Sequence, residues 1–408
     1  MGAPMRPTRT GRTLDRMTRS TTRSDFLDTR ALSRISERME ADIADDLYDG
    51  GVILIARHGE IGLHQAVGYS DRSTGRRAAL DDVFWIFSTT KQFTNVLILK
   101  AFEQGLLSPI TKVVDIVPEF RGSDRFRVGA KDRVSIADLM THRAGTSPTP
   151  WPLPPMDCAD LGRTIAAIGE MDLVAPPGDR VSYSPCLAHA LLGEIVVRTL
   201  GRGRTFTQTL HDELLDPLGM ANTRMGAPAS WRDRMVPVVA KFPPGQFFSP
   251  KDITDTAEAA HEGAELPWVG CVSTAADMYR FAEMLRRGGE LDGERILSPA
   301  SIAMAATVQT GDLVNERYNR IVAEKHWQPW LASIGLGFMM RGSGLRQTFF
   351  GTMASAGTFG GYGAGSSQFF VDPERDLTFV CLTAGVLGEA QNLHRFQTLS
   401  DMTVASVN

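Results

Sequence analysis

The chain carries the segment Phe84-Trp85-Ile86-Phe87-Ser88-Thr89-Thr90-Lys91. Serine is a weak nucleophile at neutral pH and needs a base within hydrogen-bonding distance. If a helix begins at Ser88, Lys91 follows one turn later on the same face, and the positive end of the helix dipole favours an alkoxide over a second ammonium. The spacing therefore indicates a catalytic Ser–Lys pair. The alternative that this short motif leaves open is a serine–threonine helix cap followed by a solvated lysine.

On the N-terminal side of this segment, the pattern predicts a helix and then a β-hairpin. Apolar residues recur every four positions over residues 27–47, which is typical of one face of an amphipathic helix, and Gly50-Gly51 ends it. Two strands follow at 52–56 and 61–69, joined by the turn Arg57-His58-Gly59-Glu60. A helix and a hairpin in this order predict a sheet with a helix packed on one face.

On the C-terminal side, the pattern becomes helical before strands return. The expected helices, each bounded by Gly, Pro or a polar cap, span residues 93–105, 136–142, 187–200, 206–218 and 273–288. Strands are expected at 338–340, 367–371 and 377–382, the last two joined by a turn at 372–376.

These elements predict an α/β fold class, in which an antiparallel sheet is flanked by helices and a mainly helical domain is inserted. Both ends of the chain supply the sheet, since strand signals lie before residue 88 and after residue 330. The expected α/β sheet domain comprises residues 25–87 and 266–408, and the helical domain comprises residues 88–265. Residues 1–24 are rich in Arg, Ser and Thr with almost no buriable side chains, which predicts a disordered tail.

Composition excludes several functional classes. The chain has 408 residues, a formal net charge of −4 and dispersed charges, so we expect no nucleic-acid partner. No run of 18 apolar residues is present, and residues 1–24 lack the apolar core of a secretory signal, so we expect no membrane association and a cytoplasmic location.

The sequence offers no metal site and implies no cofactor. Its four cysteines form no CxxC pair, and we expect them to be buried free thiols: Cys158, Cys186, Cys271 and Cys381. His261-Glu262 is the nearest approach to a zinc-binding HExxH motif, but Glu265 stands where the second histidine would be.

Around the Ser–Lys segment, the chain strongly resembles the class C β-lactamase and esterase branch of the penicillin-recognising serine enzymes. Relatives in that branch include family VIII esterases and the acyltransferase that loads the lovastatin side chain. The resemblance covers roughly residues 40–390. Its blocks occur in the family's order at residues 51–69, 83–91, 134–145, 177–193, 215–220, 270–278 and 289–299. This resemblance implies a β-lactamase/transpeptidase-like fold and a covalent acyl-serine mechanism.

The resemblance also implies a set of catalytic residues. Ser88 is the expected nucleophile, Lys91 its neighbouring base, and Tyr183 a phenol that accepts the Ser88 proton and passes it to the leaving group. The N–H groups of Ser88 and Ala364 are the expected oxyanion hole. We interpret His142, which falls in the family-like block at residues 134–145, as a structural hydrogen-bonding residue.

Two departures from the family pattern bear on the substrate. Pro185 stands where lactamases usually carry Asn, so a side-chain donor and acceptor for a substrate amide is missing. The third motif, expected at Gly361-Tyr362-Gly363 with a one-residue slip to Gly360 open, lacks the family's basic residue. Both departures favour an ester or a bulkier neutral acyl group over a β-lactam. The expected substrate contacts are Pro185, Gly361, Tyr362, Gly363 and the aromatic Trp268.

The predicted function is therefore serine-dependent hydrolysis of a small-molecule ester or related acyl substrate. An acyltransferase that passes the same acyl group to an alcohol or amine is the first alternative, because it shares every step up to the acyl-enzyme. A non-catalytic binding module that keeps the fold is the second.

Overall fold

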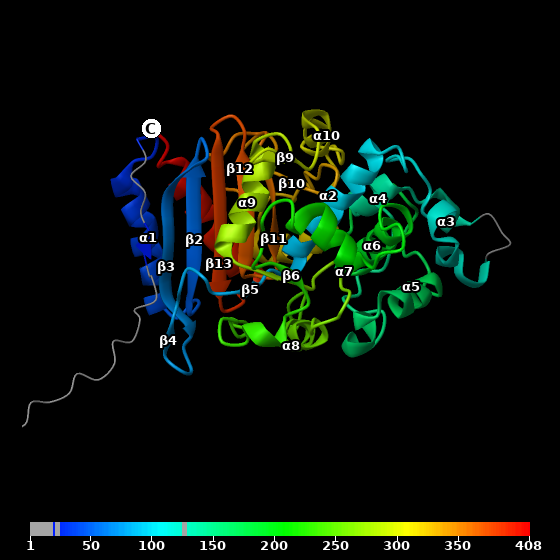
Figure 1. Ribbon diagram of the computed structural model, residues 1–408, viewed down its shortest axis with the longest axis horizontal. Helices are drawn as coiled ribbons and strands as arrows, with labels where there is room; N and C mark the ends of the chain where they lie inside the picture. Colours follow the sequence, from blue (N-terminus) through cyan, green and yellow to red (C-terminus); the bar gives the residue numbers. More distant parts are fainter. Residues whose placement is uncertain (1–18, 21–24, 125–128) are drawn as a thin grey trace, which may run out of the picture.

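The structure is a computed structural model that describes residues 19–20, 25–124 and 129–408. Its centre is an eight-stranded antiparallel sheet that takes strands from both ends of the chain (Figure 1). Across the sheet the strands run in the order β1 (Arg19–Ser20), β3 (Glu60–Asp71), β2 (Gly50–Arg57), β13 (Leu377–Ala384), β12 (Ser367–Asp372), β11 (Phe359–Gly363) and β10 (Met339–Met340), with β4 (Arg76–Arg77) paired to β3. The C-terminal strand β13 lies between β2 and β12, so the two ends of the chain form one continuous sheet.

Helices cover both faces of this sheet. Helices α1 (Thr29–Ala44) and α12 (Glu389–Val404) pack on one face, and α9 (Ala275–Arg286) packs on the other. Strand residues alternate between the two faces: Ile53 and Ile55 join the core beneath α1 and α12, while Val52 and Leu54 join the core beneath α9. Each such buried side chain contributes roughly 1.5–3 kcal/mol. Two-sided burial explains why the central strands read as continuous apolar runs.

The helices between the two halves of the sheet form a second body of structure beside it (Figure 1). Its main members are α2 (Thr90–Glu103), α4 (Ile136–Met140), α5 (Leu161–Gly169), α6 (Leu187–Thr199), α7 (Phe206–Leu210) and α8 (Pro250–Ala259). Helix α2 packs directly on α6, and every α2 residue from Thr90 to Leu99 is buried. Lys91 therefore belongs to a helix enclosed on all sides.

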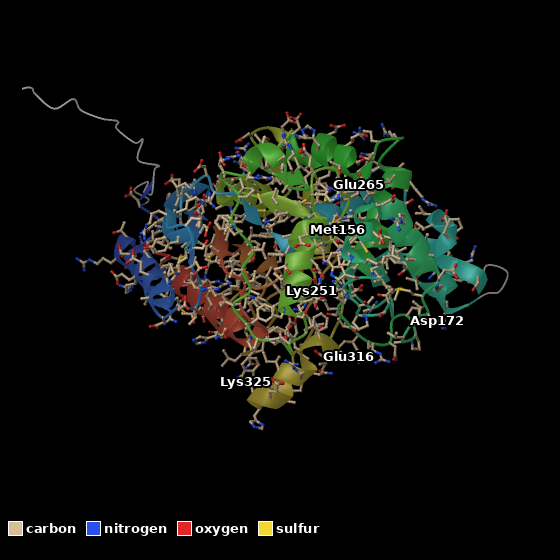
Figure 2. All side chains as sticks on the ribbon, turned by 90° about the horizontal axis from the view of Figure 1, so that it is seen from below. Met156, Asp172, Lys251, Glu265, Glu316 and Lys325 are labelled. Atoms are coloured by element: carbon tan, nitrogen blue, oxygen red, sulfur yellow. The ribbon has the colours of Figure 1, made fainter. Side chains whose placement is uncertain are left out.

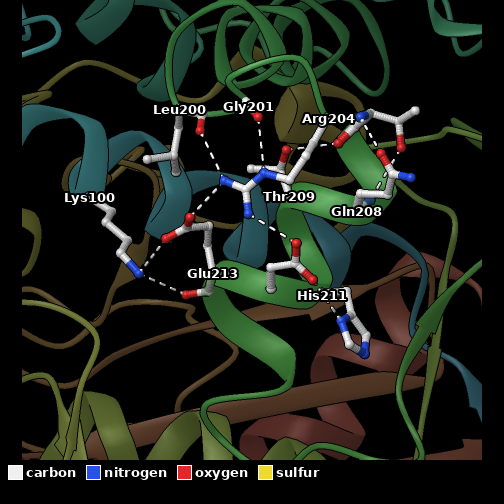
Figure 3. A network of polar contacts seen from close by, with 10 residues as sticks. Lys100, Leu200, Gly201, Arg204, Gln208, Thr209, His211 and Glu213 are labelled. Carbon is white, nitrogen blue, oxygen red and sulfur yellow. Dashed lines mark hydrogen bonds and ion pairs between the residues drawn. The ribbon is translucent and has the colours of Figure 1, made fainter.

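A polar network holds the far end of α2 in place (Figure 3). Lys100 on α2 pairs with Glu213 at 2.8 Å, and Arg204 pairs with the same Glu213 at 2.7 Å and with Asp212 at 3.0 Å. Arg204 also donates to the carbonyls of Leu200 and Gly201 beyond the end of α6. These contacts tie α2 and the loop after α6 to the turn that follows α7.

The predicted fold class is confirmed: the structure has an antiparallel sheet, helices on both faces and a mainly helical insertion. The proposed domain boundaries remain a prediction. The predicted disordered tail falls mostly outside the described residues, and the two that are described, Arg19 and Ser20, pair with β3. One local expectation needs correction, because the helix does not begin as an α-helix at Ser88: a 3-10 turn, η1 (Phe87–Thr89), precedes α2.

Within the described ranges, no helix is both long and apolar enough to cross a bilayer. The four cysteines are free and buried, as predicted from their spacing. In the same part of the chain, no group of three His, Cys, Asp or Glu side chains is placed to hold a metal ion.

Candidate active site

A short strand and a tight turn present Ser88. Strand β5 (Phe84–Trp85) pairs with β7 (Cys271–Ser273), and the chain then turns through η1 into α2. Phe87, immediately before Ser88, has φ +46°, a left-handed backbone conformation that residues other than glycine rarely adopt. Its ring is buried in the core, which holds the turn in this conformation.

Three predicted site residues meet at the Ser88 hydroxyl. The Tyr183 phenol donates to Ser88 Oγ at 2.8 Å, and Lys91 Nζ donates to the same oxygen at 3.1 Å. Lys91 also donates to the backbone carbonyl of Trp268 at 2.8 Å, which fixes the direction of its ammonium. Since Ser88 lies 95 positions from Tyr183, the fold alone makes this contact.

Burial and charge change the proton affinities of these groups. Burial lowers the pKa of Lys91, and Arg317 lowers it further, against an opposing effect of Tyr183. Burial by itself would raise the pKa of Tyr183, but the positive charges of Lys91 and Arg317 outweigh it, and the pKa of Tyr183 lies below its usual value. Both directions favour the deprotonated forms of Lys91 and Tyr183, which are the forms that can accept the Ser88 proton.

Arg317 is a site residue that the sequence did not indicate. It lies in η7 (Glu316–Tyr318), is 9% exposed, and forms an ion pair with Glu389 at 2.9 Å. No local pattern marks either residue as functional, and they lie 72 positions apart in the chain.

The third motif occupies β11 and the turn that follows it. A Cβ added to Gly363 would lie 2.2 Å from the Ile86 carbonyl, and one added to Gly361 would lie 2.8 Å from the Gln92 side chain. Both glycines therefore allow β11 to approach the nucleophile turn and α2 closely. Tyr362 lies on the opposite face of β11 from these two glycines and lines a hollow beside Ser88. Gly361 and Gly363, which were predicted substrate contacts, do not line it.

Ala364 lies in the turn after β11 and shares the pocket wall with Ser88. In the described part of the chain, the Ala364 N–H, which lies between β11 and β12, donates to no carbonyl, and the Ser88 N–H donates to none outside η1. An oxyanion hole requires backbone donors beside the nucleophile, and the role of these two N–H groups remains a prediction.

Two hollows meet at Ser88. The first has a mixed lining that includes Tyr183, Arg317, Tyr318 and Tyr362. We call it the polar lobe. The second has a mainly apolar lining, and we call it the tryptophan lobe. Its lining includes both predicted contacts Pro185 and Trp268, together with Trp151, Phe248, Ile253 and Val269.

His142 supports the site from behind, in agreement with its interpretation as a structural residue. Its Nδ1 accepts from the Ser184 N–H at 3.2 Å, and its ring lies 4.7 Å from that of Tyr183. Burial, together with the charges of Lys91 and Arg317, lowers the pKa of His142 to about 3, so this imidazole is neutral near pH 7. A neutral ring positions Tyr183 without adding charge to the site.

Comparison with known proteins agrees with this geometry. The beta-lactamase family model matches residues 35–400, which is most of the chain. The chain belongs to the beta-lactamase family. It is 29% identical to penicillin-binding protein 4 of Amycolatopsis lactamdurans over 273 residues, covering 66% of this chain and 68% of that protein. It is 30% identical to esterase EstB of Burkholderia gladioli over 186 residues, covering 42% and 45%.

A solved structure shows the same relationship across the whole beta-lactamase fold. A penicillin-binding protein homologue from Caulobacter crescentus superposes with a TM-score of 0.74 at 25% identity, covering 94% of this chain and 99% of that one. The resemblance inferred from the sequence blocks is therefore confirmed at the level of family and fold. This beta-lactamase family has serine hydrolases among its members, including esterases.

Proposed function

We propose that this protein is a serine hydrolase that cleaves an ester or related acyl substrate through an acyl-enzyme on Ser88. The observation that carries the proposal is the pair of hydrogen bonds at Ser88 Oγ, from Tyr183 at 2.8 Å and from Lys91 at 3.1 Å, where the two lobes meet. The similarity to esterase EstB supports the same class of substrate.

The proposed reaction proceeds in two steps, acylation and deacylation of Ser88. In the first, Ser88 Oγ bonds to the acyl carbon, its proton passes to the phenolate of Tyr183 or to neutral Lys91, and that proton then reaches the departing alcohol oxygen as the ester bond breaks. In the second, water loses a proton to the same base and attacks the acyl-serine carbon, the bond between that carbon and Ser88 Oγ breaks, and the base returns the proton to Oγ as the acid leaves. The N–H groups of Ser88 and Ala364 stabilise the oxyanion in both halves, where one donor is worth about 3 kcal/mol.

The lining of the lobes supports an assignment of the two substrate halves. The tryptophan lobe, with Trp151, Trp268 and Val269, suits an apolar acyl group. Pro185 on its wall offers no hydrogen-bond donor for an amide side chain. These features favour esters with hydrocarbon acyl groups over β-lactams.

A mass measurement tests the proposal. The protein is incubated with a fluorophosphonate or a p-nitrophenyl ester and examined by intact mass spectrometry and peptide mapping. We expect one covalent adduct on Ser88 that is absent in Ser88→Ala. Folded wild-type protein that forms no adduct and releases no nitrophenol would instead indicate a non-catalytic binding module.

Acyl transfer is the second candidate, and the polar lobe favours it. If the acyl group occupies the tryptophan lobe, a second hollow remains beside Ser88 that can hold an alcohol or amine acceptor. Turnover of the p-nitrophenyl ester with added alcohols or amines separates the two reactions. Ester or amide product that increases with acceptor at constant nitrophenol release indicates transfer, and free acid as the only product indicates hydrolysis.

A further inference from the structure

A buried guanidinium lies directly on the aromatic ring of the proposed base. Arg317 Cζ is 4.7 Å from the Tyr183 ring centroid. Three more aromatic rings surround the same guanidinium, those of Phe247 at 4.6 Å, Phe248 at 5.2 Å and Tyr318 at 5.5 Å. Arginine is the cation that such rings hold best, because its planar group is weakly hydrated.

Backbone pairing holds Arg317 in this position. The Glu316 N–H donates to the Val181 carbonyl at 3.0 Å, and Asn315 forms a parallel bridge with Val181, so residues 315–317 run beside the segment that leads into Tyr183. Figure 2 marks Glu316 and Lys325 on the stretch that projects at the lower edge of that view. The backbone just before Arg317 is therefore paired with the backbone just before Tyr183, the residue whose ring Arg317 contacts.

Glu389 is the counter-ion of Arg317. Its Oε1 accepts from both Nε and Nη2 of Arg317, at 3.1 and 2.9 Å. Glu389 is the first residue of α12, where the helix dipole also stabilises a carboxylate. Burial alone would lower the pKa of Arg317, but Tyr318, Glu389, Tyr362 and Tyr183 raise it, so the guanidinium stays charged at all working pH values.

The groups that face Tyr183 carry an excess of positive charge. They are Lys91 from α2, Arg317 from η7, His142 after α4 and Tyr362 from β11. His142 is neutral, and burial raises the pKa of Tyr362 to about 12, so neither adds charge near pH 7. Arg317 is therefore the only permanent cation beside Tyr183 among the described residues, since Lys91 exchanges protons during the proposed reaction.

We propose that Arg317 is a positioning residue that sets the protonation state of Tyr183, with Glu389 limiting its effect. This inference rests on the proposed function for the role of Tyr183 as a base. Gly361, in the third motif, has no charge to supply, and Arg317 supplies it from a segment more than 40 positions earlier in the chain. A neighbouring positive charge favours the phenolate over the phenol, so Arg317 lowers the pKa of Tyr183.

The experiment measures Tyr183 directly. Protein labelled with ¹³C at tyrosine Cζ is titrated by NMR, and the Tyr183 signal is assigned as the one missing in Tyr183→Phe. In Arg317→Met we expect the Tyr183 titration midpoint to rise by at least about one pH unit. Arg317→Lys keeps the charge and should recover most of this shift. Glu389→Gln removes the negative partner and should move the midpoint in the opposite direction, to lower pH.

An unchanged Tyr183 midpoint in folded Arg317→Met would overturn the proposal, as would shifts of the same sign in Arg317→Met and Glu389→Gln. If Arg317→Met does not fold, Glu389→Gln should still lower the Tyr183 midpoint while Arg317→Lys leaves it close to the wild-type value, and a raised midpoint in Glu389→Gln would overturn the proposal. In ester turnover, the acidic limb of kcat against pH should follow the NMR midpoints. NMR shifts as expected in a protein without ester turnover would support the role of Arg317 and overturn the proposed function.

Discussion

Tyr183 and Ser88 are joined by a 2.8 Å hydrogen bond between their side-chain oxygens, and both side chains lie at the wall of the polar lobe. The His142 ring lies beside the Tyr183 ring, and the Arg317 guanidinium lies over it. Groups from two other parts of the chain therefore help to place this phenol at the nucleophile.

Loss of either basic group should reduce turnover strongly. We expect Tyr183→Phe and Lys91→Ala each to reduce kcat for a p-nitrophenyl ester by at least about 100-fold, the usual scale of a general base. Tyr279→Phe is a matched control, because its phenol donates to the Gly59 carbonyl away from Ser88. Wild-type turnover in Tyr183→Phe would remove this tyrosine from the mechanism.

The buried ammonium of Lys91 should reduce stability. Its pKa is lowered chiefly by burial, so the protonated form is less favourable in the folded than in the unfolded chain. Lys91→Met should therefore raise the free energy of unfolding, by on the order of 1 kcal/mol at pH 7, while abolishing turnover.

The gain should be largest at low pH, where the lysine is charged in both states. It should decline above the lowered folded pKa and disappear near the unfolded value of 10.5, where the unfolded lysine also loses its proton. Urea unfolding at several pH values measures it. Lys100→Met on the same helix is the control, since it breaks the ion pair with Glu213 and should lower stability. A Lys91→Met protein that is less stable at every pH would contradict this prediction.

The left-handed backbone at Phe87 predicts an unusual order of stabilities. Both Phe87→Ala and Phe87→Gly lose the buried ring, at a cost of about 3–5 kcal/mol. Only glycine relieves the strain at φ +46°, so Phe87→Gly should be about 1 kcal/mol more stable than Phe87→Ala. Chemical denaturation of the two variants measures the difference. Greater stability of the alanine variant would show that the turn relaxes when the ring is removed.

Gly363 should tolerate no side chain. A Cβ there would lie 2.2 Å from the Ile86 carbonyl and 2.6 Å from Ser367 Oγ, so Gly363→Ala must push β11 away from the nucleophile turn. We expect a loss of about 1–3 kcal/mol in stability and at least a tenfold fall in kcat as Ala364 moves. Gly357→Ala is the matched control, because its added Cβ would lie no closer than 3.8 Å to Glu374 Oε1. Equal behaviour of the two variants would argue against close packing as the reason for Gly363.

The tryptophan lobe should set the preference for acyl length. Trp151→Ala enlarges this lobe, so kcat/KM for a p-nitrophenyl octanoate should rise relative to the acetate by roughly tenfold. Trp85 lies on β5 and lines neither lobe, so Trp85→Ala should leave that ratio unchanged. If the ratio changes only in Trp85→Ala, the acyl group binds elsewhere.

Local sequence determined the Ser88–Lys91 pair and the central strands of the sheet. A spacing of three residues places Lys91 beside Ser88 in any helical turn, and the apolar runs at 52–56 and 377–382 predict buried strands whatever their partners are. The ordered family blocks then identified Tyr183 and Ala364, because those blocks carry information from the whole family about which distant segments meet.

Only the tertiary structure determined the rest, because the interactions concerned connect segments with no shared local pattern. Arg317 reaches Tyr183 through the bridge between Asn315 and Val181, and its charge acts through space at 4.7 Å. Glu389 becomes its counter-ion only when α12 packs beneath the sheet. Charge and burial depend on what surrounds a side chain in the folded state, and a linear pattern of residues does not record those surroundings.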